Sequence, residues 1–286
     1  MKDLKTIFRE LISKITLHES EDEIKTIALI LLEKVFGITR TDVMTGRPVT
    51  ISPVISDKLI QLVDRINNGE PVQYVVGEAF FYGRKFIVNR SVLIPRPETE
   101  DIIRTVLSWR KSHDPARSVR VLDIGTGSGC IPITLSLELN GLRCFAIDVS
   151  ADALAVALSN AKALGGNVSF IQHDILSGPI RIANVDVIVS NPPYVTMAEM
   201  NGMRRNVLDF EPHLALFVPN DDPLRFYRAI VNQAAYSLSD AGLIAVEINE
   251  KYGAAVCDLF MTLGLKDVQV IKDVAGKDRI VKGLKK

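Results

Sequence analysis

A glycine-rich turn with an acidic residue just before it is the first place in this sequence where ligand chemistry is expected. The turn follows the apolar stretch 119–124, and a helix is predicted after it. Glycines allow positive φ and let the backbone approach a ligand without a Cβ in the way. The residues that we expect to contact a ligand here are Asp123, Gly125, Thr126, Gly127, Ser128 and Gly129.

The spacing of the glycines narrows the choice of ligand. A dinucleotide-binding turn needs GxGxxG, but Gly129 comes one residue early and Cys130 stands where the last glycine would be. The phosphate-binding pattern GxxxxGK[ST] is absent as well. Asp123 followed by GxGxG resembles the first motif of class I S-adenosylmethionine-dependent methyltransferases. The predicted cofactor is S-adenosyl-L-methionine, with S-adenosyl-L-homocysteine as its product.

Two further acidic residues end the next two predicted strands. Asp148 lies 25 residues after Asp123, where a carboxylate can accept hydrogen bonds from the ribose hydroxyls of a nucleoside. Asp174 ends the third strand, where it can accept from an adenine amino group. Either residue can also be a helix N-cap, but three carboxylates at successive carboxyl ends of one parallel sheet favour the ligand interpretation.

Asn191-Pro192-Pro193-Tyr194 is the most specific short motif, and it directly follows the apolar stretch 185–190. Consecutive prolines have fixed φ and no N–H, so they form a stiff corner with outward-facing carbonyls. A carboxamide nitrogen is a poor nucleophile that gains positive charge during methyl transfer. The Asn191 side-chain oxygen and the Pro192 carbonyl can accept its two hydrogens, with Tyr194 packed on the planar group.

Other catalytic chemistries find little support. His18, His113, His173 and His213 form no HxxxH or HExxH pair, and three cysteines without CxxC spacing argue against a zinc cluster or a disulfide framework. We therefore expect no metal. The odd number of cysteines fits a protein of the reducing cytoplasm. This expectation agrees with the sequence, in which we recognise neither a signal peptide nor a membrane-spanning stretch.

The elements that must position these motifs begin at residue 119. Apolar strands alternate with helices, including a helix over 151–164 and strands over 168–172 and 185–190, and short strands close the chain near 268–272 and 279–281. Alternation with almost continuously apolar strands predicts an α/β fold, a mostly parallel sheet covered by helices on both faces.

The first 70 residues have a different texture. Apolar residues at spacings of three and four predict helices over about 4–15, 20–37 and 55–66. The segments 74–76 and 80–88 are aromatic and β-branched, with Gly77 and Gly83 between, and predict the strands of a hairpin.

Composition limits the function classes. The chain of 286 residues carries 34 basic and 34 acidic residues, and residues 1–88 hold twelve of each, so no nucleic-acid-binding domain is indicated. With 47% hydrophobic and 24% charged residues, the chain is an ordinary globular protein of about two domains.

Longer segments resemble one family, the bacterial peptide chain release factor N5-glutamine methyltransferases (HemK/PrmC). They are GEAFFYGRKFIVN, LIPRPETE, DIGTGSGCI, SNPPY, FEPHLAL and AGKDRIV. The resemblance implies a Rossmann-like, seven-stranded methyltransferase domain over 96–286, a β-hairpin linker over 73–95 and a helical substrate-recognition domain over 1–72. It also implies a cytoplasmic monomer that acts on release factors, without stable nucleic acid or membrane binding.

The resemblance assigns roles residue by residue. Residues 125–129 and Asp148 would contact the donor, and Ile175, beside Asp174, would pack near the adenine. Asn191 would contact donor and glutamine, and Pro192, Pro193 and Tyr194 would complete the pocket for the glutamine of a Gly-Gly-Gln loop. Arg96 and Glu98 either line the substrate entrance or form an ion pair or a helix cap.

Two alternatives use the same motifs. An adenine-N6 or other exocyclic-amine methyltransferase could place a flipped base of DNA or RNA in the same pocket. A non-catalytic module could bind the cofactor or a partner without turnover. The complete set of Asp123, the three glycines, Asp148 and residues 191–194 argues against the second alternative.

Overall fold

The structure is a computed structural model of the chain, and it describes residues 1–114 and 117–286. It divides into two compact units. The first comprises Met1–Glu78 together with Arg204–Phe210, and the second comprises Ala79–Met203 and Glu211–Lys286. None of the helices in the described residues combines the length and the apolar character that a membrane span requires.

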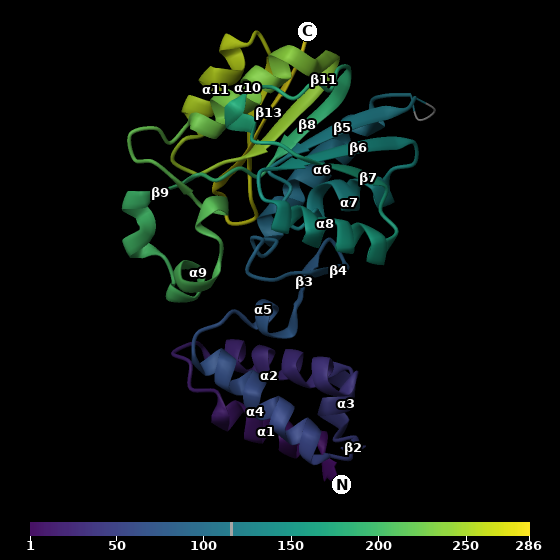
Figure 1. Ribbon diagram of the computed structural model, residues 1–286, viewed down its shortest axis with the longest axis vertical. Coiled ribbons are helices and arrows are strands. Elements are labelled where there is room, and N and C mark those ends of the chain that lie inside the picture. The colour runs from purple at the N-terminus through teal and green to yellow at the C-terminus, as the bar shows by residue number, and fades with distance from the viewer. Residues whose placement is uncertain (115–116) are drawn as a thin grey trace. The chain divides into compact units, whose positions relative to one another are not determined.

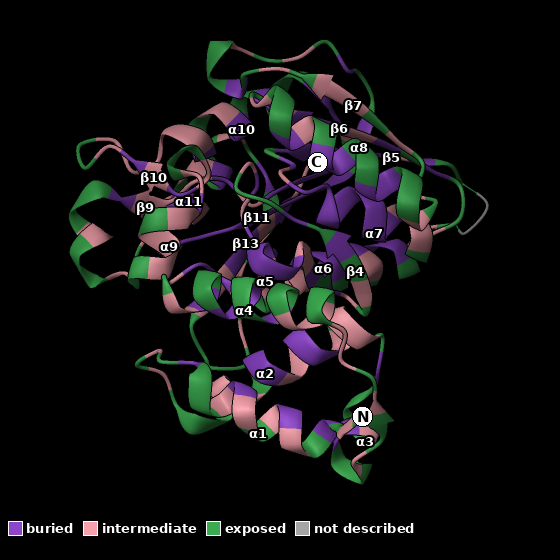
Figure 2. Cartoon of the chain, turned by 60° about the horizontal axis from the view of Figure 1, so that its bottom comes forward, coloured by how far each residue is buried: buried purple, intermediate pink, exposed green. Residues whose placement is uncertain are grey.

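The first unit is helical. Its apolar stripes form one core, and Figure 2 shows buried, intermediate and exposed residues alternating along α1. Ser20 caps α2 by accepting from Glu23 N, and Gly37 ends it in the left-handed conformation, which agrees with the helix predicted over about 20–37. The elements are α1 Leu4–Lys14, α2 Glu21–Phe36, α3 Arg40–Thr45, α4 Pro53–Asn67, α5 Val72–Val76 and α9 Arg205–Phe210, with the short antiparallel strands β1 Lys2–Asp3 and β2 Pro48–Val49.

The predicted strand over 74–76 is wrong, because these residues form the end of helix α5. Pro71 begins the helix, and Tyr74 N and Val75 N both donate to its carbonyl. At the other end, the Arg65 guanidinium donates to the Tyr74 and Val75 carbonyls, which suits the negative end of a helix. Burial in the helical core and these bonds override the preference of β-branched residues for strands.

A hairpin is present, but both of its strands follow residues 74–76 in the sequence. Strands β3 Glu78–Phe81 and β4 Arg84–Ile87 pair with each other. Tyr82 (φ 48°) and Gly83 (φ 73°) form the connection, and two consecutive positive φ values are typical of a tight hairpin turn.

The second unit is built on a seven-stranded sheet in the order β12-β13-β11-β8-β5-β6-β7 (Figure 1). Strands β5, β6, β7, β8 and β11 run parallel, and β13 is antiparallel to both β11 and β12. This confirms the mostly parallel α/β fold. The strands are β5 Val119–Ile124, β6 Leu142–Asp148, β7 Val168–Gln172, β8 Val185–Ser190, β11 Leu238–Glu247, β12 Lys266–Lys272 and β13 Asp278–Leu284.

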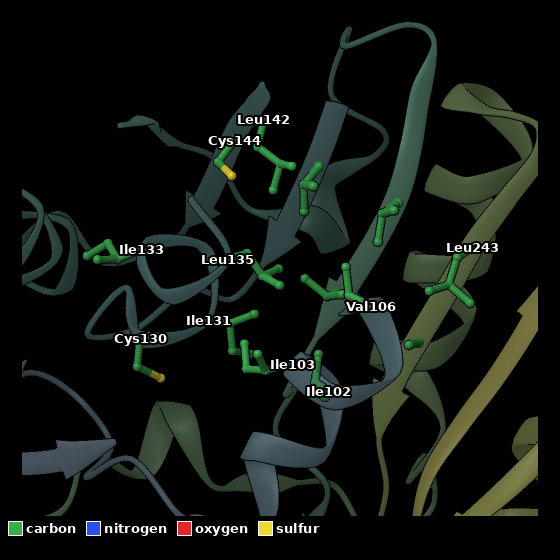
Figure 3. Packing of buried hydrophobic residues seen from close by; sticks show 14 of the residues in the cluster. Ile102, Ile103, Val106, Cys130, Ile131, Ile133, Leu135, Leu142, Cys144 and Leu243 are labelled. Atoms are coloured by element: carbon green, nitrogen blue, oxygen red, sulfur yellow. The ribbon is translucent and has the colours of Figure 1, made fainter. Parts of the chain in front are cut away.

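Helices cover both faces of this sheet (Figure 1). One face carries α6 Glu100–Lys111, α7 Cys130–Glu138 and α8 Ala151–Leu164, and the other carries α10 Arg225–Ser237 and α11 Gly253–Thr262. Alternate strand residues point to opposite faces, so Val121 and Val187 join the first core while Leu122 and Ile188 join the second. Figure 3 shows the first core, in which Ile103 of α6 and Leu135 of α7 lie among strand side chains.

Short elements complete the second unit. One precedes α6, one follows β7, and the others lie between β8 and α10. These elements are η1 Pro97–Thr99, η2 Ile175–Ser177, β9 Val195–Thr196, η3 Met197–Gly202, η4 His213–Ala215 and β10 Phe217–Val218.

Candidate active site

A cavity of about 400 Å³ opens at the carboxyl ends of β5, β6, β7 and β8. All the residues that line it belong to the second unit. In open parallel sheets this edge is where ligands bind, because the loops after the strands converge there. The cavity therefore brings together motifs that lie up to about one hundred residues apart in the sequence.

The glycine-rich turn forms one wall, and its backbone is attached to the neighbouring strand. Gly125 N and Thr126 N donate to the Ile147 carbonyl at 2.9 and 3.0 Å. Gly127 has φ 53°, and a Cβ added there would meet nothing within 4 Å, so this position faces open space. Gly129 has φ 78°, and its Cβ would lie 2.8 Å from Ile133 Cδ1. One glycine thus leaves room for a ligand, and the other leaves room for helix α7.

Asp148, at the end of β6, holds the turn and also faces the cavity. Its Oδ2 accepts from Gly127 N and its Oδ1 accepts from Ser150 N, both at 2.9 Å. Burial raises the pKa of this carboxyl, while the bonds from Ser150 and Gly127 lower it. Each oxygen keeps a second lone pair, with which Asp148 can accept from a ligand hydroxyl.

Asp123 lies beneath the turn rather than in the cavity wall. Its side chain is fully buried, and neither oxygen has a well-formed hydrogen bond among the described residues. Burial raises the pKa of Asp123 to about 7, the nearby Thr126 hydroxyl lowers it, and the negative charge of Asp148 raises it. The structure therefore places a buried acidic group with little hydrogen bonding next to the glycine turn.

Asp174 and Ile175 follow β7 on the adjacent part of the wall, and both line the cavity. Asp174 caps η2, with its Oδ1 accepting from Leu176 N at 2.9 Å, so both functions expected of it from the sequence remain compatible. Ile175 is buried and offers an apolar contact.

Residues 191–193 also line the cavity, directly after β8, the strand that neighbours β5. Asn191 donates from Nδ2 to Thr99 Oγ1 at 3.1 Å. Tyr194 is not among the described residues that line the cavity. Its hydroxyl donates to Glu247 Oε1 at 2.9 Å, and its ring packs against the second core. Stacking of Tyr194 on a substrate amide stays a prediction.

Glu247, the last residue of β11, connects these groups. Its Oε2 accepts from Thr99 Oγ1 at 2.6 Å while its Oε1 accepts from Tyr194. Burial raises the pKa of Glu247, and the hydroxyls of Thr99 and Tyr194 together with the charge of Arg279 lower it. Burial and the Glu247 charge raise the pKa of Tyr194 well above its ordinary value, so the phenol stays protonated.

Glu211 is a third buried acid, and it pairs with a residue that lines the cavity. Glu211 accepts from the Arg96 guanidinium and, at 3.2 Å, from Ile94 N. Arg96 lines the cavity, whereas Glu98 is not among the described lining residues. Of the alternatives for Arg96, the structure shows both the ion pair and a place at the cavity.

The lining residues fit a nucleoside ligand that carries positive charge. The cavity volume falls in the range of ordinary small-molecule sites. Gly127 leaves its side open, and Thr126 lines the wall. Asp148 offers free lone pairs to hydroxyls, and the buried Asp123 can supply negative charge. The roles of these residues in holding S-adenosylmethionine stay predictions.

Cysteine and metal chemistry have little basis in this site. Burial raises the pKa of the Cys130 thiol to about 12, so the thiol is protonated at neutral pH and is a poor nucleophile. Within residues 1–114 and 117–286, no group of three or more His, Cys, Asp or Glu side chains is placed to hold a metal ion.

Three residues of the site were not predicted from the sequence, namely Thr99, Glu211 and Glu247. Glu247 carries a signal that could have found it, because it is a single acid at the end of the apolar strand LIAVE, just as Asp148 ends RCFAID. Thr99 and Glu211 lie in the segments LIPRPETE and FEPHLAL, but no local spacing relates them to their partners, which are 148 and 115 residues away.

Comparison with characterised sequences gives consistent results. The chain is 41% identical over 261 residues to the release factor glutamine methyltransferase of Bacteroides thetaiotaomicron, covering 91% of this chain and 92% of the relative. It is 37% identical to that of Flavobacterium psychrophilum, with 99% and 98% covered, and 38% identical to that of Bacillus subtilis, with 97% of each covered.

Family models and solved structures agree. Residues 9–77 match the PrmC N-terminal domain, and residues 107–208 match the methyltransferase small domain. The fold resembles the hMettl16 catalytic domain, solved in complex with a MAT2A 3′UTR hairpin, at a TM-score of 0.56 and 15% identity over 84% of this chain and 85% of that one. At this identity the likeness concerns the fold alone.

Proposed function

Since the chain belongs to the release factor glutamine methyltransferase family, we propose that it methylates the side-chain amide nitrogen (N5) of the glutamine in the Gly-Gly-Gln loop of peptide chain release factors. S-Adenosyl-L-methionine is the methyl donor. The observation that carries the proposal is that the glycine turn, Asp148 and residues 191–193 line one and the same cavity.

The residues around the glycine turn and after β6 and β7 bind and orient the methyl donor. Asp148 accepts from the ribose hydroxyls, Ile175 contacts the adenine, and Asp174 accepts from its amino group through the carboxylate oxygen that η2 leaves free. The backbone of residues 125–129 takes the amino-acid part of the ligand. When bound, the donor would supply a methyl group on its sulfonium sulfur, and no metal is needed because the sulfur leaves as the neutral thioether of S-adenosylhomocysteine. The substrate nitrogen gains the methyl group and releases one proton.

The acceptor wall addresses the weak nucleophilicity of a carboxamide. Asn191 donates through Nδ2 to Thr99, so its Oδ1 is available to accept one hydrogen of the substrate NH2. The Pro192 carbonyl accepts the other. Acceptors placed in advance stabilise the positive charge that develops on nitrogen, and holding the amide in line with the methyl group contributes the rest.

The two units suggest a division of labour. We assign release factor recognition to a helical domain over 1–72, connection to the hairpin segment 73–95, and chemistry to residues 96–286. The balanced charge of the chain supports action without stable nucleic acid or membrane binding, and we place the protein in the cytoplasm as a monomer.

The direct test is mass spectrometry of a purified release factor after incubation with the protein and methyl-labelled S-adenosylmethionine. We expect one labelled methyl group on the glutamine of the Gly-Gly-Gln loop. A release factor with that glutamine changed to alanine is the control and should gain no label. Labelling of DNA or RNA adenine instead, or donor binding without transfer to either, would support one of the alternatives.

A further inference from the structure

Glu247 is a buried acid whose hydrogen bonds reach both ends of the Asn191–Tyr194 segment. It is only 1% exposed, and each carboxylate oxygen accepts from one hydroxyl, Oε2 from Thr99 and Oε1 from Tyr194. In the structure both hydroxyls donate to Glu247, which is the direction that an ionised carboxylate, with acceptors only, requires.

The direction of the Thr99 bond decides how the Asn191 amide is turned. A threonine hydroxyl has one proton, and Thr99 gives it to Glu247. Toward Asn191 it can then only accept, so the group that faces it must be the Asn191 NH2, at 3.1 Å. The amide nitrogen and oxygen are otherwise similar in shape, and it is the network of partners that distinguishes them.

The orientation matters because the two faces of the amide have opposite chemistry. With Nδ2 on Thr99, Oδ1 is the atom left for the cavity. With the amide turned over, an NH2 group would meet the NH2 of the substrate, and two donors repel each other. One conformer supports methyl transfer and the other opposes it.

We propose that Glu247 and Thr99 are positioning residues, in which the Glu247 carboxylate acts through the Thr99 hydroxyl to hold Asn191 with Oδ1 toward the substrate amide, and acts through Tyr194 to hold the far end of the proline corner. The proposal rests on the proposed function for its catalytic consequence. The orientation of Asn191 itself can be measured without any substrate.

The decisive variant is Thr99→Val, which keeps the shape of the side chain and removes the hydroxyl. We expect kcat to fall about tenfold or more, because Asn191 then populates both orientations, while KM for the release factor and Kd for S-adenosylmethionine stay within about twofold. Thr99→Ser keeps the hydroxyl and should restore most of kcat. Thr105→Val removes a hydroxyl that donates to the Asp101 carbonyl within α6, and it should leave kcat unchanged.

Glu247→Gln is a second variant that should allow the Asn191 amide to turn over. A glutamine can donate to Thr99, so the hydroxyl is free to donate to Asn191 Oδ1 and to favour the inverted amide. We expect a loss of kcat comparable to that of Thr99→Val. A parental kcat in Glu247→Gln and Thr99→Val, or an equal loss in Thr99→Ser and Thr99→Val, overturns the proposal.

Side-chain amide hydrogen exchange of Asn191, followed by NMR and assigned with Asn191→Asp, reads the orientation directly. We expect one slowly exchanging Asn191 proton in the parent and in Thr99→Ser, and faster exchange in Thr99→Val. Unchanged exchange in Thr99→Val overturns the proposal. If the parent methylates no release factor, the proposed function fails while this measurement still decides the positioning role.

Discussion

At the scale of single residues, the site depends on acids that are buried for different reasons. Glu247 and Glu211 each accept from two donors, which offsets part of the cost of burying them. Asp123 is equally buried but has no well-formed hydrogen bond among the described residues, although the nearby Thr126 hydroxyl lowers its pKa. A buried carboxylate with so little hydrogen bonding destabilises the free protein, and a positively charged ligand would compensate for it.

Changing Asp123 to Asn should stabilise the ligand-free protein at high pH. A carboxyl whose pKa is about 7 in the folded chain and 3.8 otherwise holds its proton more tightly when folded. Its contribution to the free energy of unfolding therefore falls as pH rises from about 4 to 7, and it is constant above. The advantage of Asp123→Asn should grow by roughly 1–3 kcal/mol between pH 5 and pH 8.

Urea unfolding of both proteins at these two pH values measures that difference. The same variant should bind S-adenosylmethionine more weakly at pH 8 by calorimetry, because a negative charge near the ligand is lost. A stability difference that does not change with pH would show that Asp123 ionises normally in the folded state.

Changing Asn191 to Ala should separate binding from chemistry. The alanine removes an acceptor that matters most as charge develops on the substrate nitrogen, so we expect kcat to fall about 10²-fold or more. The Kd for S-adenosylmethionine should stay within about threefold. Quenched time-course assays with labelled donor measure kcat, and calorimetry measures the Kd. Asn140→Ala, at an exposed position, serves as the control. Parental turnover would remove Asn191 from the mechanism.

At the scale of elements, the glycine turn is held in place from below by a neighbouring helix. Asn160 of α8 is fully buried and donates from Nδ2 to the carbonyls of Ser128 and Ile87, while its Oδ1 accepts from Ile87 N. One side chain thus joins the turn, helix α8 and strand β4. Because the turn is fixed on this side, only its other side remains available to a ligand.

Two glycine substitutions in the turn should differ in their main effect, one on stability and the other on donor binding. Gly129→Ala adds a methyl group 2.8 Å from Ile133 Cδ1 and 3.1 Å from Ala157 Cβ, at φ 78°, so we expect a loss of about 2–4 kcal/mol of stability. Gly127→Ala adds one into open space, so it should lose only about 1–2 kcal/mol and instead weaken donor binding at least about tenfold.

Chemical unfolding and calorimetry on both variants give the comparison. If Gly127→Ala binds S-adenosylmethionine as the parent does, the ligand does not approach this part of the turn.

At the scale of the whole molecule, the chain passes between its two units three times. It crosses after Glu78, and again on either side of Arg204–Phe210, the segment that belongs to the helical unit although sheet strands precede and follow it. Within that unit Arg204 pairs with Glu19 and Glu23. The helical unit is therefore not a simple N-terminal addition to the methyltransferase domain.

The charge of the whole chain predicts weak affinity for nucleic acid. Non-specific binding comes from neutralised phosphates, and the chain has as many acidic as basic residues. Fluorescence anisotropy with a short duplex DNA and a single-stranded RNA should show no saturable binding up to about 100 µM at about 0.15 M salt. Saturable binding in the low micromolar range would favour a nucleic-acid substrate.

The sequence by itself determined the sheet and the local parts of the site. The structure confirms the predicted strands over 168–172 and 185–190 and the predicted helix over 151–164, with the same first and last residues. Each segment has one clear apolar periodicity, so its type can be predicted from the sequence alone. Gly127, Asp148 and Asn191 were identified because each belongs to a contiguous motif next to a strand end.

Only the tertiary structure decided the rest, because the interactions involved join distant residues. Residues 74–76 have strand-forming side chains, yet burial among the helices and the Arg65 bonds make them helical. The acid that orients Asn191 stands 148 residues after Thr99, and no local spacing relates them. Hydrogen bonds across the sheet edge depend on which strands become neighbours, and that order is set by packing of the whole domain.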